Sequence, residues 1–334
     1  MSRISRHRAW SLIGATILML GALACQPART AQPGVQNVLR HELPELEPLE
    51  LAAGRKLRAI ATTSILGDIV RNVAGDAIEL TVLLQIGRDP HSYQPVPSDL
   101  TAVSRADAVF ASGFGLEEFL VDMLQNAGGE RLLLYVSAGI EPREGEAHEE
   151  EDEPEENDHG AVDPHVWLDV RHVEVWTDNI AQVLSAMDPA NAAAYRDNAV
   201  AYKAQLAELD RWIVDQIALI PTENRRLVTN HEAFGYYAER YGLEQVGAVY
   251  PVSPAAEPSA QDIARLETAI KELGVRAVFT ESTVNPRLAQ RIAQDTGVKL
   301  VQLYSGSLGG PGTGAETYID FMRYNTDAIV AALR

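Results

Sequence analysis

Short apolar runs alternate with amphipathic segments from residue 57 onward. Runs rich in aliphatic and β-branched residues predict strands, and segments with apolar residues three and four positions apart predict helices. In the first part of the chain, the predicted strands are Leu57–Ala61, Ile78–Leu84, Asp107–Ala111 and Leu132–Val136. The predicted helices are Ser64–Val73, Ser98–Ser104 and Glu117–Ala127. Strands and helices that alternate in this way form a parallel sheet covered by helices, which predicts an α/β lobe.

A long helical stretch follows between Asp169 and Ile220. Its second part begins with Asp188-Pro189, an N-cap residue and a first-turn proline, and ends before Pro221. The alternation then resumes, with strands predicted at Arg226–Thr229, Glu244–Ala248, Arg276–Thr280 and Lys299–Leu303. Helices are predicted at Glu232–Tyr241, Ser259–Leu273, Pro286–Thr296 and Glu316–Leu333.

This order of elements predicts an α/β protein made of two small lobes. Each lobe has a parallel-type sheet flanked by helices, and one long rigid backbone helix joins the two. The boundaries that we expect are a signal peptide (1–24), a flexible tether (25–55), an N-terminal lobe (56–187) with an acidic loop (141–160), the connecting helix (188–220) and a C-terminal lobe (221–334).

The N-terminus is typical of an export signal. Three arginines at positions 3, 6 and 8 precede an apolar run, Trp10–Ala24, that is too short to span a membrane comfortably. Cys25 follows directly, which resembles the cleavage site of bacterial lipoproteins, where this thiol is acylated and becomes a lipid anchor. An ordinary cleavage site at Ala22-Leu23-Ala24, which would release a soluble protein, is the alternative. Both readings predict an exported protein.

Composition excludes several functions. The chain has 47 acidic and 28 basic side chains, a formal charge of -19, so we expect no binding to nucleic acid. Cys25 is the only cysteine, which rules out internal disulfides and cysteine-based zinc modules.

Three of the eight histidines lie where ligands gather in α/β proteins. His91 and His165 each follow an Asp-Pro pair, and His231 follows the predicted strand Arg226–Thr229. Proline restricts the loop, and ligands collect at the carboxyl ends of parallel strands. Three imidazoles nearly complete a tetrahedral zinc site. The others lie in the signal, the tether, the acidic loop or on an expected helix surface: His7, His41, His148, His159 and His172.

Longer motifs containing these histidines carry a resemblance over the chain from Lys56 to the C-terminus. They are Thr62-Thr63-Ser64-Ile65-Leu66-Gly67-Asp68-Ile69-Val70, Asp89-Pro90-His91 with Pro95-Val96-Pro97-Ser98-Asp99, Asp163-Pro164-His165-Val166-Trp167-Leu168-Asp169, Asn230-His231-Glu232-Ala233-Phe234-Gly235-Tyr236, Phe279-Thr280-Glu281-Ser282-Thr283-Val284-Asn285-Pro286, Pro311-Gly312, and Thr317-Tyr318 up to Tyr324-Asn325. In this order they resemble the substrate-binding proteins of zinc and manganese ABC transporters, the helical-backbone metal receptors of cluster A-I.

The resemblance implies that a metal is held between the lobes by His91, His165 and His231. Relatives that prefer manganese tend to carry Glu at the third position, so histidine there favours zinc. Relatives usually supply a fourth ligand, an Asp, where this chain has Gly306. The site is then either three histidines and water, or a set completed by another carboxylate. Glu281 is the best candidate for that carboxylate, with the alternative that it orients an imidazole.

The acidic stretch between Glu141 and Asp158 has eleven acidic residues and one basic residue, Arg143. Such a block predicts a solvated loop. It is interpreted either as a solubilising loop or, because zinc-type relatives often carry a His- and acid-rich loop here, as a loop that collects metal weakly beside the site.

The expected function is capture of a divalent metal outside the cytoplasm, with Zn2+ favoured, and its delivery to an ABC permease for import. The expected partners are this permease and, through it, its ATPase. Mn2+ or iron is an alternative within the family. A zinc-dependent hydrolase is an alternative outside it, because three histidines and an open position also describe catalytic zinc. A surface adhesin is a third class. We expect a monomer on the outer face of the cytoplasmic membrane or in the periplasm, and no enzymatic activity.

Overall fold

The computed structural model describes residues 43–52, 54–117, 119–120, 123–124, 133–143, 162–250 and 258–334. These residues belong to one compact unit, Gly34–Arg334. The predicted signal peptide, Cys25, His41 and most of the acidic stretch lie outside the described residues. Among the described residues, no helix has both the length and the apolar character needed to cross a membrane.

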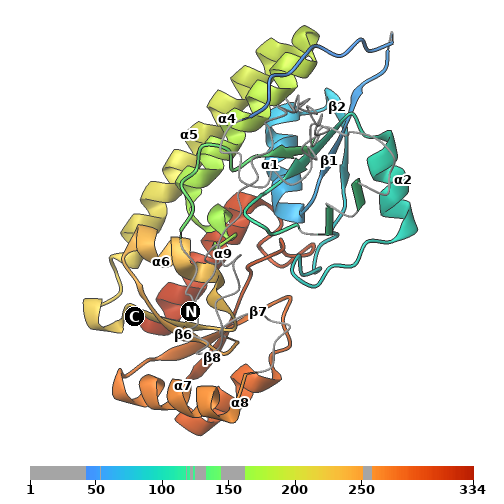
Figure 1. The fold of residues 1–334 in the computed structure, drawn as a ribbon. Coiled ribbons are helices and arrows are strands. Elements are labelled where there is room, and N and C mark those ends of the chain that lie inside the picture. Colours follow the sequence, from blue (N-terminus) through green and yellow to red (C-terminus); the bar gives the residue numbers. More distant parts are fainter. Residues whose placement is uncertain are drawn as a thin grey trace, which may run out of the picture. The chain divides into compact units, whose positions relative to one another are not determined.

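The first lobe is built on a four-stranded parallel sheet in the order β2-β1-β3-β4 (Figure 1). Its strands are β1 (Leu57–Ala61), β2 (Ile78–Val82), β3 (Ala108–Ala111) and β4 (Leu133–Tyr135). Between them lie α1 (Ser64–Ala74) and α2 (Pro97–Arg105). Thr63 caps α1 by accepting a hydrogen bond from the Leu66 amide, which fixes where this helix begins.

The second lobe repeats this arrangement with the order β6-β5-β7-β8. Its strands are β5 (Arg226–Thr229), β6 (Glu244–Ala248), β7 (Ala277–Glu281) and β8 (Lys299–Leu303). Its helices are α6 (Gly235–Tyr241), α7 (Ala260–Glu272) and α8 (Arg287–Thr296). The predicted fold class is thus confirmed: there are two parallel sheets flanked by helices, with a long helix between them in the chain.

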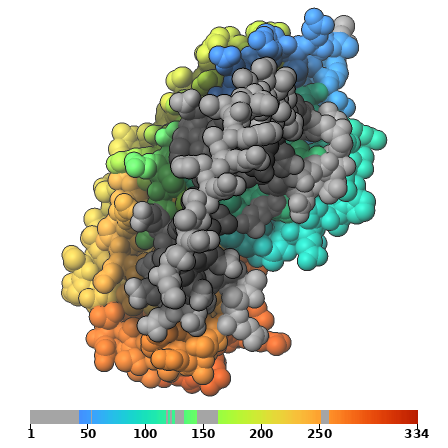
Figure 2. Space-filling view, viewed as in Figure 1, coloured from blue at the N-terminus to red at the C-terminus, as the bar shows by residue number. Residues whose placement is uncertain are grey.

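Two long helices, α4 (Val170–Met187) and α5 (Ala192–Ile217), pack side by side (Figure 1). The helix α4 also packs against α1 of the first lobe, whereas α5 contacts both α1 and α6 and so runs along both lobes. Their surfaces run along one edge of the space-filling view in yellow-green and yellow (Figure 2). The α-helical part is shorter than the predicted 188–220. Pro189–Asn191 form a 3-10 turn, and the last α-helical residue is Ile217. Proline lacks the amide that an α-helix interior needs, so the regular helix starts after this turn.

The C-terminal helix α9 (Tyr318–Leu333) connects the second lobe to the rest of the molecule. It packs against α5, β8 and α1, so it contacts elements of both lobes. At its first turn, the backbone amide of Tyr318 donates to the Asp68 carboxylate of α1 at 2.9 Å. Burial raises the pKa of Asp68, although this hydrogen bond counteracts the rise. The lobes are therefore held together by α5, by α9 and by a buried polar contact.

The last part of the predicted flexible tether is ordered against the core, which corrects the prediction for those residues. Leu43, Leu46 and Leu51 pack on the main apolar cluster, and the Leu49 amide donates to the Met187 carbonyl at 2.9 Å. The prediction failed because irregularly spaced leucines show neither helix nor strand periodicity, yet they still bury apolar surface when they lie over a core.

The buried residues of α5 should contribute more to the free energy of unfolding of the protein than its exposed residues do. Leu206 is fully buried, whereas Val200 on the same helix is 68% exposed. We expect Leu206→Ala to lower the free energy of unfolding by about 2–5 kcal/mol, because it leaves a cavity in the core. Val200→Ala should change the free energy by less than about 0.5 kcal/mol. Urea unfolding followed by circular dichroism measures both, and equal losses would contradict this packing.

Candidate metal site

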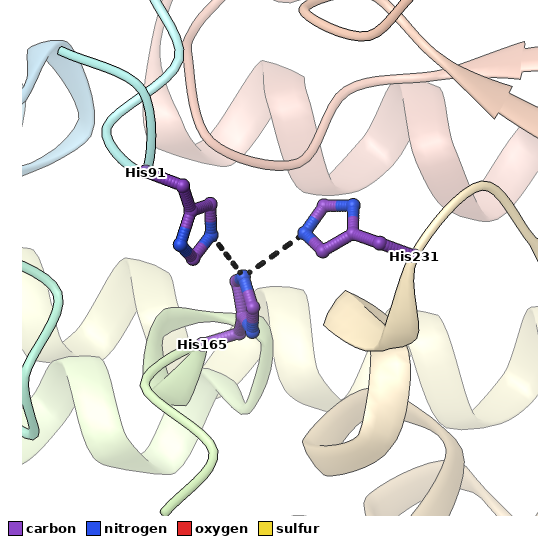
Figure 3. A group of neighbouring side chains, drawn as sticks. All are labelled: His91, His165 and His231. Atoms are coloured by element: carbon purple, nitrogen blue, oxygen red, sulfur yellow. Dashed lines mark hydrogen bonds between the residues drawn. The ribbon is translucent and has the colours of Figure 1, made fainter. Parts of the chain in front are cut away.

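Three loops bring the three predicted histidines together (Figure 3). His91 lies in the loop between β2 and α2, and His165 directly precedes the 3-10 turn Val166–Leu168. His231 follows β5 and precedes the 3-10 turn Glu232–Phe234. Two of the imidazoles thus come from the first lobe and its continuation, and the third comes from the second lobe.

The ring nitrogens of the three histidines converge on one point. Nε2 of His165 lies 3.0 Å from Nε2 of His91 and 3.2 Å from Nε2 of His231. One ligand atom from each residue lies within 4.8 Å of the others. Nitrogens bound tetrahedrally at about 2.0–2.1 Å from zinc would be about 3.3 Å apart, so the cluster has nearly the spacing of a zinc site.

Asp163 fixes the orientation of His165. One of its carboxylate oxygens, Oδ1, lies 2.8 Å from Nδ1 of His165 and accepts the His165 backbone amide at 3.0 Å. A carboxylate only accepts, so Nδ1 carries the proton and Nε2 directs a lone pair at the cluster. Asp163 was part of the recognised motif, but its role was not predicted.

Glu281 plays the same part for His231. Its Oε1 lies 2.8 Å from Nδ1 of His231 and accepts the His231 backbone amide at 3.1 Å. This contact is on the side of the ring away from the other imidazoles. Of the two roles considered for Glu281, the geometry favours the orienting role over that of a fourth ligand.

The lone pairs of two oriented imidazoles facing each other repel unless a cation lies between them. Loss of hydration and the two neighbouring imidazoles lower the pKa of His91 well below its ordinary value. Burial would also lower the pKa of His231, but the Glu281 carboxylate outweighs it and raises that pKa. Burial in turn would raise the pKa of Glu281, yet its contact with His231 lowers it. Protons therefore compete with a metal for His231 before they compete for His91.

Hydrogen bonds between the lobes surround the site. The Trp167 indole donates to the Ser305 carbonyl at 2.9 Å, and the Tyr318 hydroxyl donates to the Trp167 carbonyl at 2.7 Å. On the other side, the hydroxyls of Ser64 and Ser307 lie 3.2 Å apart. These contacts fix how far apart the loops that carry the histidines can lie.

Arg143 and Asp163, which lie on either side of residues 144–161, are neighbours close to His165. The Asp163 amide donates a hydrogen bond to the Arg143 carbonyl at 3.1 Å. The Arg143 guanidinium lies 3.5 Å from Oδ2 of Asp163 and 3.6 Å from Glu239 of α6. Sequence patterns did not identify Arg143 as a contact of the site, because its partners are distant in the chain.

His172 does not join the cluster, as expected, but it is half-buried rather than on the surface. Its Nδ1 lies 3.2 Å from the Val166 carbonyl, and its ring packs edge-on against Tyr236. His7, His41, His148 and His159 lie outside the described residues.

A known family matches this fold and site. The model of the family described as "Zinc-uptake complex component A periplasmic" matches residues 60–332. The chain belongs to this family. It is therefore a member of the metal-binding substrate-binding proteins of ABC transporters, which are binding components and not enzymes.

Curated relatives are similar over most of the chain. The manganese-binding lipoprotein MntA of Halalkalibacterium halodurans is 38% identical over 281 residues, which cover 84% of this chain and 89% of MntA. The manganese ABC transporter substrate-binding lipoprotein PsaA of Streptococcus pneumoniae is 32% identical over 291 residues, covering 85% and 91%.

Solved structures share the fold. The periplasmic zinc-binding protein TroA of Treponema pallidum has a TM-score of 0.75 and 30% identity, covering 83% of this chain and 99% of TroA. The manganese-bound periplasmic metal-binding protein of Candidatus Liberibacter asiaticus has a TM-score of 0.74 and 28% identity, covering 84% and 100%. Relatives of this fold thus include proteins named for zinc and for manganese.

The orienting role of the two carboxylates can be separated from direct ligation. We expect Asp163→Asn and Glu281→Gln each to weaken metal binding by about 10- to 100-fold, with one ion still bound per chain. The reason is that an amide holds the imidazole less firmly and carries no charge. Glu244→Gln, which changes a carboxylate with a 63% exposed side chain in the same lobe, is the control. If Glu281→Gln weakens binding as much as His231→Ala, Glu281 is a ligand rather than an orienting residue.

Proposed function

We propose that this protein captures zinc outside the cytoplasm and delivers it to an ABC permease and its ATPase. The observation that carries the proposal is the convergence of three Nε2 atoms, two of them on imidazoles oriented by buried carboxylates. The pattern matches the way metal-binding histidines are usually held. Membership of a family of transport proteins supports delivery to a membrane partner.

Zinc is the proposed cargo because the donors are nitrogens. Imidazole suits zinc and other late divalent metals, whereas manganese favours carboxylate and water oxygens. The third histidine position carries imidazole, and Gly306 has no side chain that could donate an oxygen. We propose that a water molecule completes the coordination, since Glu281 is engaged with Nδ1 of His231.

Manganese is the second candidate, and the relatives favour it. Both MntA and PsaA are named for manganese, and the first is 38% identical to this chain. The names of those two proteins state their metal, whereas for this chain the donor set supports zinc. A direct comparison of the two metals decides between the candidates.

We further propose that Cys25 is acylated and anchors the monomeric protein at the outer face of the cytoplasmic membrane. The relatives MntA and PsaA are named lipoproteins, and Cys25 follows the apolar run of the predicted signal peptide. A lipid anchor would keep the binding unit near its permease. The helices α5 and α9 contact elements of both lobes and oppose wide closure, so release requires only a small displacement of one lobe against the other.

Metal titrations test the proposed function. Calorimetry on metal-free protein should show one zinc ion per chain and weaker binding of manganese. His91→Ala, His165→Ala and His231→Ala should each weaken zinc binding by at least about 100-fold, because each removes a donor rather than an orienting group. His172→Ala, which changes a histidine outside the cluster, should bind zinc as the unaltered protein does.

Two results would contradict the proposal in different ways. Zinc affinity that survives every one of the three replacements would show that the site is elsewhere. Tighter binding of manganese than of zinc by the unaltered protein would leave the site in place and give the cargo to the second candidate.

A further inference from the structure

The three imidazoles of the site are not held in the same way. His165 and His231 are each fixed by a buried carboxylate at Nδ1. Within the described part of the chain, Nδ1 of His91 has no hydrogen-bond partner. Asp89, the counterpart of Asp163 in the repeated Asp-Pro-His motif, instead accepts the His91 backbone amide at 3.1 Å and the Ser92 hydroxyl at 2.8 Å. The position of the His91 ring therefore depends on where its loop lies.

That loop rests on the second lobe. The Gly87 amide donates to the Ser307 hydroxyl at 2.8 Å. Three residues further on, the buried Pro90 lies directly on Gly306. A Cβ added to Gly306 would lie 2.8 Å from Cδ and 3.3 Å from Cγ of Pro90. Both separations are shorter than the ordinary contact of about 3.5–4.0 Å between carbon atoms.

Gly306 is needed for this close approach and not for its backbone conformation. Its φ lies outside the left-handed region that other glycines of the chain occupy, so alanine could adopt the same backbone. The Pro90 ring is closed on its own backbone and cannot rotate away from an added methyl group. A side chain at position 306 would thus displace Pro90 and, with it, the next residue, His91.

We propose that Gly306 is the positioning residue of His91: its bare backbone is the surface on which Pro90 rests, and this contact brings the third imidazole into the metal site. The inference rests on the proposed zinc function and deepens it.

A set of small substitutions tests the contact. Gly306→Ala should weaken zinc binding at least about tenfold, the size of effect seen when a group that orients a ligand is lost. Gly310→Ala is the matched control, because it lies four residues away, has no atom within 4 Å of its added Cβ and also has φ outside the left-handed region. It should bind zinc as the unaltered protein does.

Two double variants separate positioning from a general structural effect. Pro90→Ala removes both atoms that the new methyl group would meet, so adding Gly306→Ala to Pro90→Ala should cause little further loss. In a His91→Ala background, Gly306→Ala should also cause no further loss, since the residue that it displaces is already absent.

Calorimetry with zinc chloride on the full binding unit gives every value. Equal zinc affinity of Gly306→Ala and the unaltered protein, or an additive loss in either double variant, would overturn the inference while leaving the zinc site intact. Absence of zinc binding by the unaltered protein would overturn both this inference and the proposed function.

Discussion

The structure is organised around three imidazole Nε2 atoms that converge on one point. Two are forced into this arrangement by buried carboxylates, Asp163 and Glu281, which bind the opposite ring nitrogen. The lone pairs of His165 and His231 repel each other without a cation, because their Nε2 atoms lie 3.2 Å apart. A divalent ion converts the repulsion into coordination, so metal binding should also stabilise the fold by mass action.

The frame around the site limits how its ligands can move. The helices α5 and α9 each contact both lobes. Asp68, Ser64 and Trp167 also form hydrogen bonds with residues beyond β8, which connect the first lobe to the second. Because packed cores do not deform continuously, small displacements at such an interface are the natural route to release. His91 is the ligand without an orienting carboxylate, and its loop depends on a contact with the opposite lobe. Two of the ligands are thus held by buried carboxylates, whereas the position of the third depends on the contact between its loop and the opposite lobe.

Much of this arrangement can be predicted from the sequence. Strand periodicity located β1, β5, β6 and β8 with the bounds that the structure shows. The two Asp-Pro pairs and the end of strand β5 identified the three histidines that converge, because such loops gather at the carboxyl ends of parallel strands. The 3-10 turn at Pro189 and the packing of Leu43 were not predictable, since they depend on tertiary contacts rather than on local periodicity. The two Asp-Pro-His motifs have the same sequence but differ in structure. Asp163 binds the imidazole ring of His165, whereas Asp89, among the described residues, accepts from the His91 backbone amide and the Ser92 hydroxyl.

X-ray absorption at the zinc K edge of the zinc-loaded protein tests the central claim most directly, because it reports the donors themselves. The account predicts three imidazole nitrogens at about 2.0–2.1 Å, with one light donor such as water and no sulfur. A spectrum with two or fewer imidazoles, or one dominated by carboxylate oxygens, would contradict it.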